Sequence, residues 1–171
     1  MLALIKGAKN ILEIGTLGGY STIWFARALP SDGKLITLEA NPDYAKVANN
    51  NIKRAGLDKI VQLKLGKALD ILPQLVLENN EPFDLIFIDA DKINNSEYFK
   101  WCLKLSKSGT IIIADNVVRN GEIIDETSED ISVKGIRDFN ELVSKEKKVI
   151  TTAIQTVGIK GYDGFAMILV K

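Results

Sequence analysis

The sequence predicts an α/β fold with a Rossmann-like, mostly parallel sheet of seven strands, helices on both faces and a C-terminal antiparallel hairpin. Short apolar runs alternate with helical patterns along nearly the whole chain, which is typical of parallel strands joined by right-handed crossovers. The last two apolar runs are joined by a glycine-containing segment in place of a helix, as in a hairpin. The 171 residues contain no linker or low-complexity tract, so a single domain over 1–171 is expected.

The first half of the chain contains three of the expected strands, over residues 11–14, 35–38 and 60–65. Helices are expected to follow the first two strands, over residues 20–29 and 41–55. Pro30 closes the first helix. Asn41 followed by Pro42 is a strong start for the second, because asparagine caps helix N-termini and proline suits the first helical position. Gly56 suits the C-terminal cap of that helix.

The second half contains the other four expected strands, over residues 83–88, 110–114, 149–157 and 165–170. Helices are expected over 68–78, with a local disturbance at Pro73, and over 132–145. Between residues 88 and 110, another helix is predicted by four residues that share one face: Tyr98, Trp101, Cys102 and Leu105. The seven residues 158–164 contain three glycines and are interpreted as the hairpin connection. The segment Tyr162-Asp163-Gly164-Phe165 is assigned to that hairpin, although its tyrosine could reach a substrate.

Composition narrows the classes of function. The 22 basic and 22 acidic residues cancel, so no overall field draws the protein toward nucleic acid or a membrane. Histidine is absent, which excludes histidine-based zinc sites and Ser-His-Asp triads. Cys102 is the single cysteine, so an internal disulfide is excluded and a reducing cytoplasm is expected. No run approaches the roughly 20 apolar residues of a membrane span, and the N-terminus lacks a signal-peptide pattern.

Two acidic clusters directly follow two of the apolar strands. Asp89 comes after residues 83–88, with Asp91 and Lys92 close behind, and Asp115-Asn116 follows residues 110–114. Neighbouring parallel strands end at one edge of a sheet, where ligands bind. Two carboxylates and an amide oxygen at that edge can hold a hard cation such as Mg²⁺. Asp91 is expected to lie outside the ligand set.

A glycine-rich turn follows the first strand and opens the same edge. Its sequence, Gly15-Thr16-Leu17-Gly18-Gly19, is not the dinucleotide pattern G-x-G-x-x-G, but its glycines allow close approach to a ligand. Glu13 precedes the turn, and Glu39 ends the next strand, where an acidic side chain can accept hydrogen bonds from ribose hydroxyls. The pattern predicts a nucleotide-like cofactor.

Four segments together resemble the metal-dependent O-methyltransferases of the caffeoyl-coenzyme A and catechol type, including small bacterial members. They are residues 13–21 (EIGTLGGYS), 38–42 (LEANP), 88–92 (IDADK) and 114–116 (ADN). The resemblance implies a seven-stranded methyltransferase sheet and S-adenosylmethionine (SAM) as cofactor. Family members usually carry a few helices before the first strand. Only residues 2–9 precede it here, so the chain is expected to be a fragment, a start-site variant or a naturally shortened protein.

The resemblance also implies roles for individual residues. The cofactor-binding positions are Glu13, Gly15, Tyr20, Ser21, Glu39, Ala40, Ala68 and Asp89. The metal ligands are Asp89, Asp115 and Asn116, and the catalytic residues are Lys92 and Asp89. Glu39 is expected at the ribose and Ala68 beside the adenine. Mg²⁺ is the expected cation, although the same oxygen ligands accept Mn²⁺ or Ca²⁺.

The implied reaction makes chemical sense. A phenol with a pKa of about 10 is mostly protonated at neutral pH, and a cation bound to two vicinal hydroxyls would favour the phenolate while Lys92 takes the proton. A catechol-like small molecule is therefore the expected acceptor, and a homodimer the expected assembly. Two alternatives stay open: methylation of a hydroxylated tRNA base, and a shortened, non-catalytic module that binds SAM. A nicotinamide oxidoreductase is disfavoured because G-x-G-x-x-G is missing.

Overall fold

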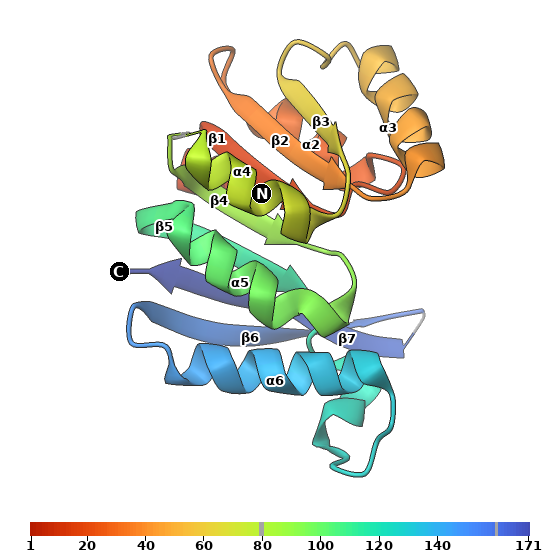
Figure 1. Cartoon of the computed structure of the whole chain (residues 1–171), viewed down its shortest axis with the longest axis vertical. Coiled ribbons are helices and arrows are strands. Elements are labelled where there is room, and N and C mark those ends of the chain that lie inside the picture. The colour runs from red at the N-terminus through yellow and green to blue at the C-terminus, as the bar shows by residue number, and fades with distance from the viewer. Residues whose placement is uncertain (79–80, 160) are drawn as a thin grey trace.

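A computed structural model describes residues 1–78, 81–159 and 161–171. Its strands form one sheet in the order β3-β2-β1-β4-β5-β7-β6 (Figure 1). They are β1 (Asn10–Ile14), β2 (Lys34–Glu39), β3 (Val61–Leu65), β4 (Phe83–Ile88), β5 (Ser106–Asp115), β6 (Val149–Gly158) and β7 (Gly161–Val170). Strands β1 to β5 pair in parallel, and β7 runs antiparallel to both β5 and β6. The predicted fold class is confirmed.

Helices cover both faces of the sheet. They are α1 (Leu2–Lys6), α2 (Tyr20–Ala28), α3 (Pro42–Arg54), α4 (Ala68–Leu77), α5 (Asn95–Lys104) and α6 (Ile131–Lys145), with the 3-10 turns η1 (Lys92–Asn94) and η2 (Arg119–Ile124). Figure 1 shows α4, α5 and α6 in front of the sheet. Their apolar side chains join one face of the strands in one core, where Phe99 and Phe139 meet edge to face at 6.0 Å between ring centroids. Residues of α1, α2 and α3 join the opposite face in a second core.

Two local sequence signals can be checked in the helices: the capping residue at the start of α3 and the proline inside α4. The side chain of Asn41 accepts hydrogen bonds from the N–H groups of Asp43 at 2.8 Å and Tyr44 at 3.3 Å, so the predicted N-cap of α3 is confirmed. Helix α4 runs through Pro73 without a break. The predicted disturbance is therefore limited to the one N–H group that proline lacks.

The predicted seven-residue hairpin connection over 158–164 is wrong. Strands β6 and β7 pair from Val149 and Val170 as far as Gly158 and Gly161, and residue 160 lies outside the described residues. Gly164 sits within the paired strand, where an added Cβ would lie 2.4 Å from the carbonyl oxygen of Ile154. This glycine permits close approach of backbones inside the sheet and does not mark a loop.

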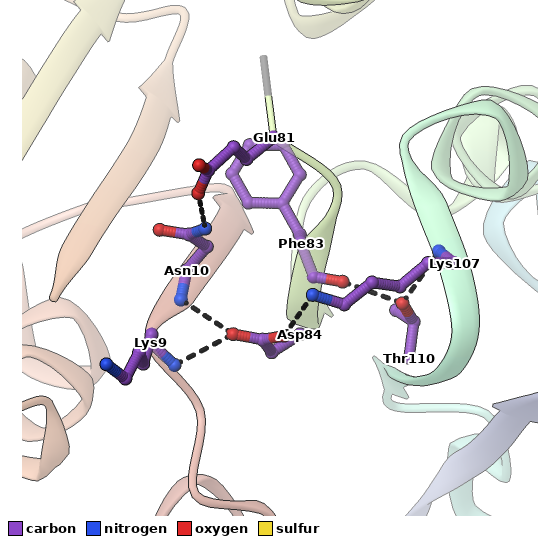
Figure 2. A network of polar contacts seen from close by, with 7 residues as sticks. All are labelled: Lys9, Asn10, Glu81, Phe83, Asp84, Lys107 and Thr110. Atoms are coloured by element: carbon purple, nitrogen blue, oxygen red, sulfur yellow. Dashed lines mark hydrogen bonds and ion pairs between the residues drawn. The ribbon is translucent and has the colours of Figure 1, made fainter.

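A polar network joins the strands at the edge where they begin (Figure 2). The Asp84 carboxylate accepts hydrogen bonds from the N–H groups of Lys9 at 2.8 Å and Asn10 at 3.0 Å, and pairs with Lys107 Nζ at 2.8 Å. Burial raises the pKa of Asp84, but Lys107 and the two N–H groups lower it more, so the pKa lies below its usual value. The network ties the start of β4 to β1 and to β5. A cavity of about 590 Å³ lies beside it, and none of the predicted site residues lines that cavity.

Among the described residues, no helix has the length and apolar character needed to cross a membrane.

Candidate active site

The glycine turn brings the carboxyl ends of three strands together. Gly15 has φ +100°, and a Cβ on it would lie 2.0 Å from the carbonyl oxygen of Asp89, so only glycine fits here. Its N–H group donates to the carbonyl of Leu38 at 3.0 Å, and the N–H group of Asp89 donates to the carbonyl of Ile14 at 2.9 Å. The turn after β1 is therefore joined to the ends of β2 and β4.

Glu39 holds the glycine turn in shape from the end of β2. Its side chain is buried, and one carboxylate oxygen accepts hydrogen bonds from the N–H groups of Leu17 at 2.8 Å and Thr16 at 3.3 Å. The other oxygen accepts from the N–H group of Asn41 at 2.8 Å. One carboxylate thus connects the turn to the start of α3.

A cavity of about 360 Å³ opens at this edge, beside the turn. Five of the residues predicted to bind the cofactor line it: Gly15, Glu39, Ala40, Ala68 and Asp89. Leu17, Tyr44 and Tyr98 also line it and were not predicted to do so. The cavity therefore lies where the sequence places a cofactor.

Glu13 lies beneath the turn and is not among the described residues that line the cavity. Its side chain is fully buried and accepts hydrogen bonds from the hydroxyls of Ser21 at 2.5 Å, Thr37 at 2.7 Å, and Thr22. Burial raises the pKa of Glu13 above its usual value, even though these hydroxyls lower it. The structure thus engages Ser21 with Glu13, whereas Tyr20, the first residue of α2, is 79% exposed.

Asp89 and Lys92 form an ion pair at the end of β4. Lys92 Nζ lies 3.0 Å from Asp89 Oδ1, and the lysine is only 7% exposed. The lysine backbone in η1 packs against α6, because an added Cβ on Gly135 would lie 2.5 Å from the Lys92 carbonyl oxygen. This close packing against α6 fixes the position of the backbone that carries the Lys92 amine.

Asp115 and Asn116 lie at the end of the adjacent strand. Ile88 of β4 is paired with Ala114 of β5, so Asp89 and Asp115 are the next residues on neighbouring strands. Burial and the charge of Asp89 raise the pKa of Asp115, and Lys92 lowers it, so all three charges interact. The described residues contain no cluster of three or more histidine, cysteine or acidic side chains suited to a metal. The candidate set here is two carboxylates and one amide.

The chain has the fold, the cofactor-sized cavity and the ordered motifs of a methyltransferase, and comparison with known proteins decides its family. The sequence profile of the O-methyltransferase family matches residues 1–169. The chain belongs to the O-methyltransferase family. The SAM-dependent O-methyltransferase predicted from the motifs is thereby confirmed as the enzyme class.

Relatives of this O-methyltransferase match over nearly all of its length. A catechol O-methyltransferase of Niastella koreensis is 57% identical over 171 residues, which is 100% of this chain and 77% of the relative. A catechol O-methyltransferase of Mycobacterium tuberculosis is 46% identical, over 99% of this chain and 77% of the relative. The crystal structure of an O-methyltransferase from Bacillus cereus in complex with SAH is 60% identical, with a TM-score of 0.97, over 99% of this chain and 77% of that one. TomG of Streptomyces achromogenes, in complex with SAM, is 48% identical, with a TM-score of 0.96, over 99% of this chain and 76% of that one.

One contact of this methyltransferase site escaped the sequence reasoning. Tyr98 was assigned only to an apolar helix face, but its hydroxyl donates to Asp91 Oδ1 at 2.5 Å. Asn94 donates to the other oxygen of Asp91. The loop that carries Asp89 and Lys92 is therefore fastened to α5. No helical spacing marks this contact in the sequence, because Asp91 has an extended backbone before η1, whereas Tyr98 lies in α5.

Proposed function

We propose that this O-methyltransferase transfers the methyl group of SAM to one hydroxyl of a catechol-like phenol. The observation that carries the proposal is the buried amine of Lys92, held 3.0 Å from Asp89, which lines the cavity. The same amine is close enough to Asp115 to lower the pKa of that carboxyl. The acceptor class is supported by the relatives from Niastella koreensis and Mycobacterium tuberculosis, both named catechol O-methyltransferases.

In this proposal SAM occupies the cavity beside the glycine turn and supplies the methyl group. Glu39 accepts three N–H groups, and a carboxylate has about four lone-pair sites, so capacity remains for a ribose hydroxyl. Ala40 and Ala68 would border the nucleoside, and Gly15 lets the backbone approach it. Tyr20 and Ser21 would lie toward the methionine end. Glu13, bonded to three hydroxyls, would support the turn from below.

The donor set at the strand ends fits a hard divalent cation. Asp89 and Asp115 bring two negative charges together, and their repulsion contributes to the raised pKa of Asp115. A divalent cation bound by these carboxylates and Asn116 would hold both vicinal hydroxyls of the acceptor and polarise them. Mg²⁺ is the proposed cation, and Mn²⁺ and Ca²⁺ suit the same oxygen ligands.

Lys92 is the proposed base. Its backbone packs against α6, its side chain is buried, and its amine lies 3.0 Å from the Asp89 carboxylate, at the edge where the acceptor would lie. In its neutral form the amine would take the proton from the acceptor hydroxyl as the oxygen attacks the methyl group. The remaining contribution to catalysis would be alignment of the acceptor oxygen with the sulfonium methyl group. The strand ends favour this alignment because they hold the surrounding side chains in fixed positions.

Calorimetric titration with SAM, followed by a methyl-transfer assay on catechol with Mg²⁺ or with EDTA, tests the proposal. We expect SAM binding and transfer that is lost in EDTA and in Asp89→Asn. Asp125→Asn is the matched control, because Asp125 is an exposed carboxylate in the loop after η2 that accepts hydrogen bonds from the N–H group and the hydroxyl of Thr127. SAM binding without transfer to catechol would refute the acceptor class, and a parallel assay on tRNA would then show whether a nucleic acid is the acceptor.

The homodimer implied by the resemblance stays a prediction. The face of β6 and β7 turned away from α6 exposes Ile150, Ile154 and Leu169, at 60%, 42% and 41%. Sedimentation velocity at micromolar concentration checks the assembly, and a monomer would contradict it.

A further inference from the structure

Two buried threonine hydroxyls connect the glycine turn to the sheet. Thr16 of the turn and Thr37 of β2 are 3% and 0% exposed, and their hydroxyl oxygens lie 2.6 Å apart. The Thr37 hydroxyl donates to Glu13 Oε2 at 2.7 Å. Because a hydroxyl carries a single hydrogen, Thr37 accepts the hydrogen of Thr16. The turn is therefore joined through two hydroxyls to the buried carboxylate of β1.

Glu13 is a fixed end for this connection. It pairs in register with Thr37 across strands β1 and β2, so the two side chains lie on the same face of the sheet. Its carboxylate also accepts the hydroxyls of Ser21, at 2.5 Å, and Thr22, both in α2. Three hydroxyls from two elements thus hold this carboxylate, and the packing of β1, β2 and α2 sets its position.

The backbone of the glycine turn needs support at Leu17. Its φ of 49° lies in the left-handed region, which residues other than glycine keep only when their surroundings hold them there. Glu39 supplies one support, because it accepts the N–H groups of Leu17 at 2.8 Å and Thr16 at 3.3 Å. The hydrogen bond from the Thr16 hydroxyl to Thr37 supplies a second. Gly15 and Leu17, on either side of Thr16, line the cavity of about 360 Å³.

We propose that Thr37 is a positioning residue for the cofactor, although it does not line the cavity. It accepts the Thr16 hydroxyl and so holds the glycine turn in the shape that borders SAM. The inference rests on the proposed SAM site, and it gives a role to a strand residue outside the four segments that resemble the family. Because the turn borders the nucleoside, breaking this bond weakens binding of the nucleoside half of SAM.

Calorimetric titration of SAM into Thr16→Val and Thr37→Val tests the role. Valine keeps the branched shape of threonine and replaces its hydroxyl with a methyl group. Thr16→Val leaves the bond between Thr37 and Glu13 in place, whereas Thr37→Val removes both bonds. We expect each variant to bind SAM about 5-fold or more weakly, the order of one hydrogen bond. An affinity of Thr16→Val within about 2-fold of the wild type would overturn the proposal, even if Thr37→Val fails to fold.

The double variant Thr16→Val/Thr37→Val distinguishes one shared contact from two independent effects. Residues that act through a single bond give non-additive losses, so the double variant should bind SAM about as weakly as Thr37→Val alone. Additive losses would contradict the shared contact.

A shorter ligand shows which half of the cofactor the threonines support. 5′-Methylthioadenosine lacks the amino-acid part of SAM, and its affinity should fall by the same factor as that of SAM. A loss confined to SAM would mean that Thr37 acts through Glu13 on the methionine end, and would overturn the role of the turn.

Thr110→Val is the matched control. Thr110 is a fully buried threonine of β5, at the edge where the strands begin (Figure 2). Its hydroxyl donates to the Phe83 carbonyl at 2.6 Å and accepts the Lys107 N–H group at 3.0 Å, so the variant also loses one donated and one accepted bond. Its urea midpoint should fall about as much as that of Thr37→Val, while its SAM affinity stays within about 2-fold of the wild type.

Thr37→Ser supplies a rescue, because it keeps the hydroxyl, and its SAM affinity should return to near that of the wild type. Equal losses of SAM affinity in Thr110→Val and Thr37→Val would assign the effect to general stability and overturn the positioning role. Absence of SAM binding in the wild type would instead refute the proposed SAM site itself.

Discussion

Replacing Asp84 with alanine should destabilise the fold without altering the site. The variant removes the acceptor of the Lys9 and Asn10 N–H groups and the partner of Lys107, at the edge opposite the active site. The half-buried N–H group of Asn10 loses its partner at a cost of about 1–2 kcal/mol. The exposed N–H group of Lys9 and the half-exposed amine of Lys107 each add less than about 1 kcal/mol. We expect a loss of about 2–3 kcal/mol, which is a Tm decrease of about 5–10 °C for a chain of this size.

Urea unfolding at pH 7, with circular dichroism as the signal, measures this loss. Asp32→Ala is the control, because its carboxylate pairs with the Lys9 side chain while 65% exposed, and no measurable change is expected. Methyl transfer per folded molecule should be retained in Asp84→Ala. A free energy of unfolding within about 0.5 kcal/mol of the wild type, the usual spread of surface substitutions, would refute the reasoning.

The pH dependence of the same variant gives a second check. The pKa of Asp84 is lowered in the folded state from 3.8, so its contribution is present above that value and is lost as the pH falls through the lower folded pKa. The difference between the wild type and Asp84→Ala should therefore be constant from neutral pH down to about pH 5 and shrink below about pH 4.

The other predictions concern the site. Lys92→Met keeps a buried side chain of similar length but removes the amine, so kcat should fall by about 100-fold or more while the affinity for SAM is retained. A kcat near that of the wild type in steady-state assays would exclude Lys92 as the base. Gly15→Ala places a Cβ 2.0 Å from the Asp89 carbonyl oxygen, at a residue whose φ is +100°. We therefore expect a destabilisation of more than about 1–2 kcal/mol, measured by urea unfolding. We also expect loss of SAM binding, measured by calorimetry. The pKa of Glu13 is raised from 4.5 by burial, so its contribution to stability is largest below that pH and decreases as the pH rises through the folded pKa. The stability deficit of Glu13→Gln should therefore shrink with rising pH, and a deficit independent of pH would contradict this assignment.

Much of the fold and part of the site follow from short-range patterns. Helix α3 begins after Asn41 because the Asn41 side chain accepts hydrogen bonds from N–H groups two and three residues away. The position of Asn41 directly before Pro42 predicts this cap from the sequence. Asp89 and Asp115 each directly follow an apolar run, and the rule that parallel strands end at one edge brings them together. Gly15 was predicted to allow close approach to a ligand, and the structure shows that it also allows close approach to the backbone of Asp89.

The contacts that sequence reasoning missed join residues far apart in the chain. Glu13 was assigned to the cofactor, which stays a prediction, but its hydrogen bonds to hydroxyls of α2 and β2 were not foreseen. Asp163 was assigned to a hairpin loop, yet it lies in a paired strand and accepts hydrogen bonds from backbone N–H groups of the segment after β5. No periodic pattern marks either contact, because polar partners of this kind are chosen by the packing of separate elements.

Local chemistry in the chain is sufficient for the alternation of strands and helices, for the caps and for the two carboxylates at one sheet edge. These features depend on side-chain periodicity and on neighbours within a few residues. Only the folded structure shows the partners of the remaining polar groups. It buries Lys92, whose backbone packs against α6, it bonds Glu13 to Ser21, and it brings Asp163 to the N–H groups of Val118 and Arg119. The physical reason is that a buried polar group must find a partner, and which partner is within about 3 Å depends on how distant segments pack.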